Sequence, residues 1–341
     1  MAAVLAHHFW FQDLELSTLG VRLFFVLSGF LLTSILLREG EAAERQDMPQ
    51  RLVLRDFYIR RILRIWPAYY FALVAAVVLG ADSVARTFGW HAFFASNFLF
   101  FREQQWFPPV AAHLWTLSVE EQFYLVLPLV VLFVPRRFLA PILIACIAAS
   151  IGFRMVIAAT VTGSTDFYVV LPISELDALC GGALLGLGQH VAGPIAWKRL
   201  LAWSLLPTAI LYFGGWSPAA DFALGYPAYV ATMIALVAGA AAGIGGWPGR
   251  VLSAGPIVYL GRISYGVYLY HLFVAAGCDK AAQMLGYAPL PDGPIRYLVL
   301  FSATIVVAAA SWQWLERPAL SLRRHFRRAT IAQTLVPATP A

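Results

Sequence analysis

The chain has 341 residues, of which 60% are hydrophobic and only 12% are charged, and its formal net charge at pH 7 is +6. About a quarter of the residues of a soluble domain are charged, so this composition excludes an ordinary soluble domain and indicates an integral membrane protein. A surplus of basic residues in such a protein is first a signal of membrane topology, and nucleic-acid binding is not expected from it.

Ten apolar runs approach the roughly 20 residues that a helix needs to cross a bilayer. They cover residues 1–11, 18–37, 62–80, 112–134, 139–160, 173–189, 200–215, 222–245, 254–278 and 295–315. The first run is short, which predicts a truncated first helix. A further run, 88–101, is too short to cross and rich in aromatic residues, so we expect it to be interfacial or re-entrant. The sequence therefore predicts an all-α, polytopic membrane bundle of about ten transmembrane helices.

The domain organisation is predicted to be simple. We expect one transmembrane domain over residues 1–328 and a short, disordered cytoplasmic tail over residues 329–341. No internal repeat is evident, and the first residues lack the basic region of a cleavable signal sequence. The three cysteines are odd in number and lie in apolar runs, so they predict neither a disulfide framework nor a metal cluster.

The placement of basic residues predicts the orientation in the membrane, because Lys and Arg accumulate in short cytoplasmic loops. If the N-terminus is cytoplasmic, eighteen of the 24 basic residues lie on the cytoplasmic side and four in outer loops, which leaves Arg22 and Arg154 in helices. The eighteen are Arg38, Arg45, Arg51, Arg55, Arg60, Arg61, Arg64, Arg136, Arg137, Lys198, Arg199, Arg250, Arg262, Arg317, Arg323, Arg324, Arg327 and Arg328. We therefore expect a multi-pass protein of the plasma (inner) membrane with both termini in the cytoplasm.

Two histidines, His7 and His8, end the first apolar run. A histidine inside a membrane helix can be a core residue with satisfied hydrogen bonds. Histidine also titrates near neutrality and is the most common proton-transfer side chain, so we favour a functional role. In the second run, Ser28 and Gly29 are interpreted as small residues that allow close helix packing.

A cluster of arginines precedes the third apolar run. Arg60, Arg61 and Arg64 lie just before Pro67, which is expected to kink the helix. Arginine suits phosphate because its planar fork donates two parallel hydrogen bonds. The cytoplasmic bias explains the earlier arginines without a ligand. It explains Arg61 and Arg64 less well, because they lie one turn apart and lead into the membrane, so a phosphate-binding role stays open for them.

The most informative stretch, 113–125, reads His-Leu-Trp-Thr-Leu-Ser-Val-Glu-Glu-Gln-Phe-Tyr-Leu and opens a long apolar run. In a helix His113, Glu120 and Tyr124 share one face, whereas Glu121 points about a hundred degrees away. One carboxylate is thus placed to orient the imidazole. Ser118 and Glu121 also match a capping box, which is the alternative interpretation of Glu121 as a helix-start residue.

Two later segments carry weaker signals. Glu175 and Asp177 open the sixth long run with no adjacent cation, and acidic residues favour a helix start, so their role is predicted to be structural. In the ninth run, Ser264, Tyr268 and His271 share one helix face, with His271 near the middle of the membrane. This polar stripe indicates either a water-filled cavity or hydrogen bonding between helices.

Acyl transfer from a cytoplasmic thioester such as acyl-CoA to a hydroxyl accounts for these features together. A histidine base removes the hydroxyl proton, a carboxylate orients the histidine, and arginines hold the phosphates of CoA. No nucleophile motif such as Gly-x-Ser-x-Gly is present, which favours direct transfer. The alternative is a transporter of a polar solute or a proton-coupled carrier. A glycosyltransferase is disfavoured because the loops are poor in aspartate.

Four segments, 20–31, 60–70, 113–124 and 264–271, resemble in sequence and order the motifs of the acyltransferase-3 family. Members are multi-helix membrane proteins that O-acylate sugars, peptidoglycan, lipopolysaccharide and some macrolides. The resemblance implies about ten helices, acyl-CoA (acetyl-CoA in the simplest case) as co-substrate without a metal, and a hydroxyl-bearing acceptor such as an envelope saccharide.

For individual residues, the resemblance implies catalytic roles for His7, His113, Glu120, Glu121 and His271, and phosphate contacts from Arg60, Arg61 and Arg64. The spacing Val-Leu-Ala-His makes His7 the better match to the family's essential histidine, with His8 as the second choice. Two positions differ from the family's usual pattern. The sequence begins six residues before His7, so the position eleven residues before that histidine, where the family usually carries an arginine, lies outside it. Arg22 stands where many members have aspartate.

Overall fold

The computed structural model describes residues 2–10, 16–193 and 195–326, and within these residues the chain is helical and contains no strand. The helices of the first half are α1 (Ala2–Phe9), α2 (Leu16–Arg45), α3 (Gln50–Val78), α4 (Asp82–Arg86), α5 (Phe88–Ala92), α6 (Ser96–Glu103), the 3-10 helix η1 (Pro109–Ala111), α7 (Leu114–Phe133) and α8 (Arg136–Thr160).

The second half begins with the short helix α9 (Asp166–Val169). It continues with α10 (Pro172–Ala192), α11 (Trp197–Phe213), α12 (Pro218–Ala220), the π-helix η2 (Asp221–Gly225), α13 (Tyr226–Ala241), α14 (Gly246–Leu252), α15 (Gly255–Met284), α16 (Pro294–Ser311), the π-helix η3 (Trp312–Glu316), α17 (Arg317–Ser321) and α18 (Arg323–Phe326). The predicted tail, 329–341, lies outside the described residues.

Within the described residues, helices occupy most of each of the ten predicted apolar runs. Six helical segments of the described chain are both long and apolar enough to cross a bilayer: α2, α3, α7, α8, residues 218–241 and residues 294–321. Of the others, α1 has eight residues and α11 has seventeen. These findings confirm the prediction of an all-α polytopic membrane bundle.

Two helices extend well beyond the apolar runs that predicted them. Helix α2 continues from Leu37 to Arg45, and α3 begins at Gln50, twelve residues before the predicted start at Ile62. Hydropathy detects only the apolar part of a helix, whereas hydrogen bonding continues into the polar part. As a result, the segment that carries the arginine cluster is helical, and only four residues separate it from α2.

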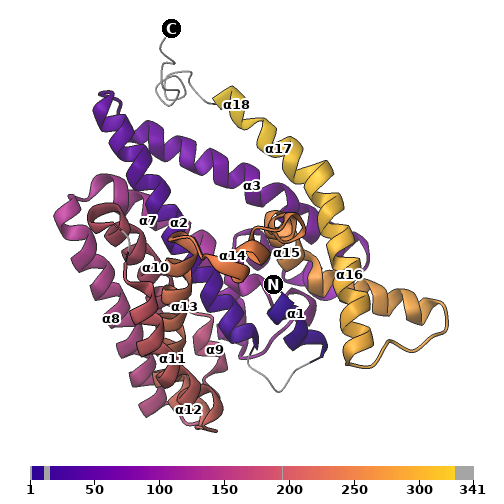
Figure 1. Cartoon of the computed structure of the whole chain (residues 1–341). Coiled ribbons are helices and arrows are strands. Elements are labelled where there is room, and N and C mark those ends of the chain that lie inside the picture. The colour runs from indigo at the N-terminus through magenta and orange to yellow at the C-terminus, as the bar shows by residue number, and fades with distance from the viewer. Residues whose placement is uncertain (1, 11–15, 194, 327–341) are drawn as a thin grey trace.

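Helix α2 is the centre of the bundle. It packs against α1, α3, α7, α10 and α13, and α10 in turn packs against α8. In Figure 1, α8, α10, α11 and α13 lie together on one side, and α16 and α17 lie on the other. Because α2 packs against helices on both sides of the bundle, its side chains contact residues of α7 and of α10.

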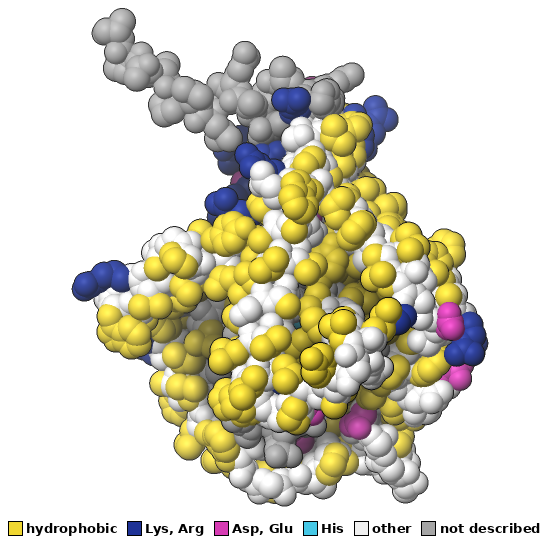
Figure 2. Space-filling view, turned by 90° about the vertical axis from the view of Figure 1, so that its right-hand side faces the viewer, with side chains coloured by type: hydrophobic (Ala, Val, Ile, Leu, Met, Phe, Trp, Pro, Cys, Tyr) yellow, Lys and Arg dark blue, Asp and Glu magenta, His cyan; other side chains and the backbone are white. Residues whose placement is uncertain are grey.

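The outer surface of the bundle is apolar, as expected of a protein in lipid. Large hydrophobic side chains such as Phe71, Val78, Leu125, Leu129 and Trp203 are exposed, and Figure 2 shows hydrophobic side chains over most of one face. A contiguous apolar surface of this extent would be a liability in water but is matched to a bilayer. The chain is therefore a multi-pass membrane protein.

The predicted interfacial segment 88–101 folds as α5 and α6 and docks on its neighbours. Tyr69 of α3 donates to the His91 carbonyl at 2.8 Å, and Gln122 of α7 donates to the Phe94 carbonyl at 2.8 Å. The His91 ring is buried between the hydroxyls of Thr87 and Ser96. Burial lowers the pKa of His91 to about 4, because the charged ring would lose its hydration.

Candidate active site

Three histidines from distant parts of the chain meet inside the bundle. The ring of His271, on α15, lies 4.8 Å from the ring of His113 and 5.3 Å from the ring of His8, measured between centroids. His113 immediately precedes α7, and His8 is near the end of α1. His271 is fully buried and His113 almost so. The tertiary fold thus gathers side chains that are up to 263 positions apart in the sequence, from 8 to 271.

Backbone carbonyls determine the tautomers of two of these rings. His113 Nε2 lies 2.9 Å from the Leu269 carbonyl oxygen, and His271 Nδ1 lies 2.6 Å from the Tyr268 carbonyl oxygen. A carbonyl only accepts, so each of these nitrogens carries the proton and donates it. The other nitrogens, His113 Nδ1 and His271 Nε2, are buried and have no hydrogen-bond partner. Each is therefore a neutral imidazole with an available lone pair, as a general base requires.

The structure distinguishes between the two N-terminal histidines. The His8 ring faces His271, with centroids 5.3 Å apart, and the rings of His7 and His8 lie 5.4 Å apart. Consecutive residues on a helix point about a hundred degrees apart, so only one of the pair can face α15 directly. Geometry therefore places His8, the second choice from sequence, next to His271.

Glu120 lies on α7, two turns from His113, and has partners other than a histidine. Ser28 Oγ donates to Glu120 Oε1 at 2.5 Å, and Tyr124 donates to Ser28 Oγ at 3.1 Å. The expected hydrogen bond between a carboxylate and the imidazole of His113 is not found, since a backbone carbonyl takes that place. Glu120 follows His113 by seven positions, which corresponds to about 10 Å of helical rise.

Glu121 faces a different direction from Glu120, as predicted. Its Oε2 accepts from the indole of Trp66 at 3.5 Å, while its Oε1 is buried without a hydrogen-bond partner. The capping-box interpretation of Glu121 is wrong, because α7 begins at Leu114 and Ser118 lies inside the helix. The Ser118 hydroxyl donates instead to the Leu114 carbonyl one turn earlier.

The three arginines proposed for phosphate differ in their partners. Arg60 pairs with Glu39 at 2.5 Å, and Arg64 pairs with the buried Glu316 at 3.0 Å. The guanidinium of Arg61 lies over the ring of Tyr124, 4.8 Å from its centroid, and within the described residues it forms no ion pair. Arg61 therefore keeps its hydrogen-bond donors available beside the cluster formed by Ser28, Glu120 and Tyr124.

The polar stripe on α15 is bonded to a neighbouring segment through Tyr268. The hydroxyls of Tyr268 and of Thr116 on α7 lie 2.5 Å apart, and Tyr268 donates to the His113 carbonyl at 3.1 Å. Tyr268 also stacks on Phe24 of α2, with centroids 6.2 Å apart. This is the helix-to-helix alternative considered from sequence, and it forms a layer between the histidines and Glu120.

Two buried ion pairs correct the interpretation of the acidic residues on α10. Arg22 pairs with Glu175 at 3.1 Å, and Arg154 of α8 pairs with Asp177 at 2.5 Å. The cations come from other helices, so they are not adjacent in sequence. A usable signal was present, because Arg22 and Arg154 were the two basic residues that the topology left inside helices, and charges there need partners.

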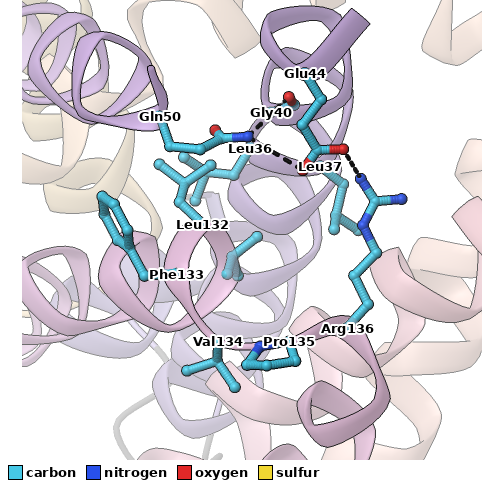
Figure 3. A pocket seen from close by; sticks show the side chains of 11 residues that line it. Leu36, Leu37, Gly40, Glu44, Gln50, Leu132, Phe133, Val134, Pro135 and Arg136 are labelled. Atoms are coloured by element: carbon cyan, nitrogen blue, oxygen red, sulfur yellow. Dashed lines mark hydrogen bonds and ion pairs between the residues drawn. The ribbon is translucent and has the colours of Figure 1, made fainter. Parts of the chain in front are cut away.

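A cavity of about 280 Å³ lies between α2, the start of α3 and the turn from α7 to α8 (Figure 3). Apolar residues such as Leu36 and Leu132 line it together with Glu44, Gln50 and Arg136. Gln50 donates to the Gly40 carbonyl at 3.0 Å, and Arg136 pairs with Glu44 at 3.1 Å. None of the predicted site residues lines it, so it is separate from the histidine cluster. Across the described residues, no group of three His, Cys, Asp or Glu side chains is placed to hold a metal ion.

Comparison with known proteins adds independent information. A family model described as an acyltransferase domain matches residues 2–313. The chain is 26% identical to the peptidoglycan O-acetyltransferase OatA of Listeria monocytogenes over 93% of its length, and 26% identical to the putative peptidoglycan O-acetyltransferase YrhL of Bacillus subtilis over the same share. It is 29% identical to nodulation protein 10 of Rhizobium leguminosarum over 95% of its length.

The extent of these matches differs between the relatives. The chain spans about half the length of the two peptidoglycan O-acetyltransferase relatives, 53% and 52%, but 88% of nodulation protein 10. No solved structure matches the chain.

Proposed function

Since the chain belongs to the acyltransferase-3 family, we propose that it is a membrane O-acyltransferase that moves an acetyl group from acetyl-CoA to a hydroxyl of a saccharide. The names of two relatives support an O-acetyl transfer to a saccharide polymer. The single observation that carries the proposal is the buried histidine pair, in which each ring has one nitrogen held by a carbonyl and one nitrogen without a partner.

His271 is the general base in this proposal. The Tyr268 carbonyl holds Nδ1–H, so Nε2 is the nitrogen that removes the acceptor's hydroxyl proton. General-base catalysis of this kind contributes about a hundred- to ten-thousand-fold in rate. His113 Nδ1, on the neighbouring ring, accepts a second hydrogen bond from the acceptor, and His8 completes the wall of the site. Burial keeps out water, which would otherwise hydrolyse the thioester.

Arg61 is the phosphate ligand that the structure favours among the three arginines. Arg60 and Arg64 already hold carboxylates, and an anion would have to compete with Glu39 or Glu316 for them. Arg61 has no such competitor among the described residues, and its planar fork suits a diphosphate. The proposal places Arg61 toward the cytoplasm, with both termini on that side of the plasma membrane, as the distribution of basic residues predicts.

Purified protein in detergent, given labelled acetyl-CoA and an oligosaccharide acceptor, tests the proposal. We expect labelled ester to form, and the variant His271→Ala to lose at least a hundredfold in rate. His190→Ala is the matched control, because His190 pairs with Glu41 outside the cluster and should leave the rate unchanged. Detergent abolishes any gradient, so consumption of acetyl-CoA also excludes a transporter. Full activity of His271→Ala would remove this residue from the mechanism.

A further inference from the structure

We propose that the hydroxyl of Ser28 is a transient carrier of the acyl group, so that transfer proceeds through a covalent acyl-Ser28 ester. The inference rests on the proposed function and adds a nucleophile to it. Its basis is the contact between Ser28 on α2 and Glu120 on α7, two helices that pack side by side near the centre of the bundle (Figure 1).

The local geometry is that of a nucleophile beside its base. Ser28 Oγ donates to Glu120 Oε1 at 2.5 Å, and the Tyr124 hydroxyl donates to Ser28 Oγ at 3.1 Å, which fixes the direction of the serine proton. A hydroxyl within hydrogen-bond reach of a base, with a third group that orients the pair, is the arrangement that activates a serine. Arg61, the favoured phosphate ligand, lies over the Tyr124 ring of the same cluster.

Comparison with other buried serines shows why this contact differs from a structural one. Ser150 and Ser311 also approach carboxylates, Asp177 and Glu316, each at 3.4 Å. Those carboxylates are neutralised by ion pairs with Arg154 and Arg64. Within the described chain, Glu120 has no cation within ion-pair distance.

The consequence concerns proton transfer. The carboxylates beside Ser150 and Ser311 are committed to guanidinium groups and are weak bases. Glu120 is not committed, so it is free to take the proton of the hydroxyl that it contacts.

An ester on Ser28 lets the donor and the acceptor bind in turn, without both having to occupy the site together. Glu120 adjoins Ser28, so the same carboxylate can act in both steps. The histidines lie about 10 Å along α7 from Glu120, beyond Tyr268 and Phe24, so in this route they bind the acceptor away from its reacting hydroxyl.

The chemistry balances in two steps. First, Ser28 Oγ attacks the thioester carbonyl carbon, its proton passes to Glu120, the carbon–sulfur bond breaks, and CoA leaves as the thiol with the proton that Glu120 received. Second, the acceptor oxygen attacks the ester carbonyl as its proton passes to Glu120, which adjoins the ester. The bond from the carbonyl carbon to Ser28 Oγ breaks, and Glu120 returns the proton to Ser28. In this two-step route Glu120 takes the acceptor proton that His271 takes in direct transfer.

Isotope exchange tests the covalent step without an acceptor. Purified full-length protein is incubated with acetyl-CoA and labelled free CoA, and label should appear in acetyl-CoA because formation of the ester is reversible. Ser28→Ala should lose this exchange at least a hundredfold, and Glu120→Gln should lose it as well. Ser28→Cys keeps a nucleophile and should restore exchange, which separates loss of chemistry from loss of folding.

Mass spectrometry of peptides identifies the carrier directly. Without an acceptor the second step cannot occur, so an acetyl group should accumulate on Ser28 of the wild-type protein and be released by hydroxylamine. If wild-type protein acetylates the saccharide but shows no exchange, and Ser28→Ala keeps full activity, the acyl-Ser28 intermediate is refuted while the proposed O-acyltransferase function is retained. If neither transfer nor exchange occurs in folded protein, the proposed function itself falls.

Discussion

The contact between α2 and α10 offers the sharpest test of the packing. A Cβ atom added at Gly182 would lie 2.0 Å from the carbonyl oxygen of Val26 and 3.0 Å from the nitrogen of Phe30. The reciprocal position, Gly29, is as tight, because its Cβ would lie 1.9 Å from the carbonyl oxygen of Leu179. Both obstacles are backbone atoms of a helix, which cannot rotate away as a side chain does. Gly182→Ala must therefore push the two helices apart.

The size of the effect follows from these distances. A Cβ is essentially never closer than 3.0 Å to another heavy atom, so the gap of 2.0 Å at Gly182 has to widen by at least 1.0 Å. A radial gap of about that size removes a quarter to a half of the dispersion energy of the contacts between α2 and α10. Overpacking typically costs about 1–3 kcal/mol, and a clash between backbones belongs at or above the upper end.

The assay is thermal unfolding in detergent followed by tryptophan fluorescence. We expect Gly182→Ala to lower the apparent midpoint by about 5 °C or more. It should also reduce exchange activity, because Ser28 is adjacent to Gly29 and moves with α2. Gly188→Ala on the same helix is the control, since its Cβ would meet only Ile195 Cδ1 at an ordinary 3.7 Å. A midpoint for Gly182→Ala equal to that of the control would refute the reasoning.

Three further predictions test other features. Arg154→Ala leaves Asp177 as an unpaired buried charge and should cost about 3–5 kcal/mol in the free energy of unfolding, whereas replacing both residues by leucine should cost much less; equal losses would contradict the role of the pair. Arg61→Ala should raise the KM for acetyl-CoA more than it lowers kcat. Arg60→Ala should change this KM little, because the Arg60 side chain of the wild type already pairs with Glu39. A larger rise in KM for Arg60→Ala than for Arg61→Ala in steady-state kinetics would exclude Arg61 as the phosphate ligand. His91 has a pKa of about 4 in the folded protein and near 6.5 in the unfolded protein, so the unfolded state binds the proton first and the protein loses stability as pH falls below 6.5. Between pH 7 and pH 5, the loss in the free energy of unfolding should be about 2 kcal/mol smaller in His91→Gln than in the wild type. An unchanged pH dependence of unfolding in this variant would contradict the low pKa of His91.

Distances within one helix were predictable from sequence, whereas the partners of α7 were not. The separation of Glu120 from Glu121 around α7 follows from helical geometry alone, and the structure confirms it. The partner of His113 was predicted to be a carboxylate and is the Leu269 carbonyl, 156 residues away. Any backbone carbonyl can accept such a bond, so no residue type in the sequence marks the one that does.

Sequence by itself determined that this is a membrane helix bundle of the acyltransferase-3 family, because apolar runs of bilayer length and ordered motifs depend only on local composition. It also marked His113, His271 and Arg61 as candidates, since ionisable side chains are costly within apolar segments. Tertiary structure alone decided that His8 faces His271 and that, among the described residues, Arg61 has no carboxylate partner whereas Arg60 and Arg64 have one. It also decided that Ser28 meets Glu120. These contacts join different helices, and the packing that brings those helices together is not encoded in any single stretch of the chain.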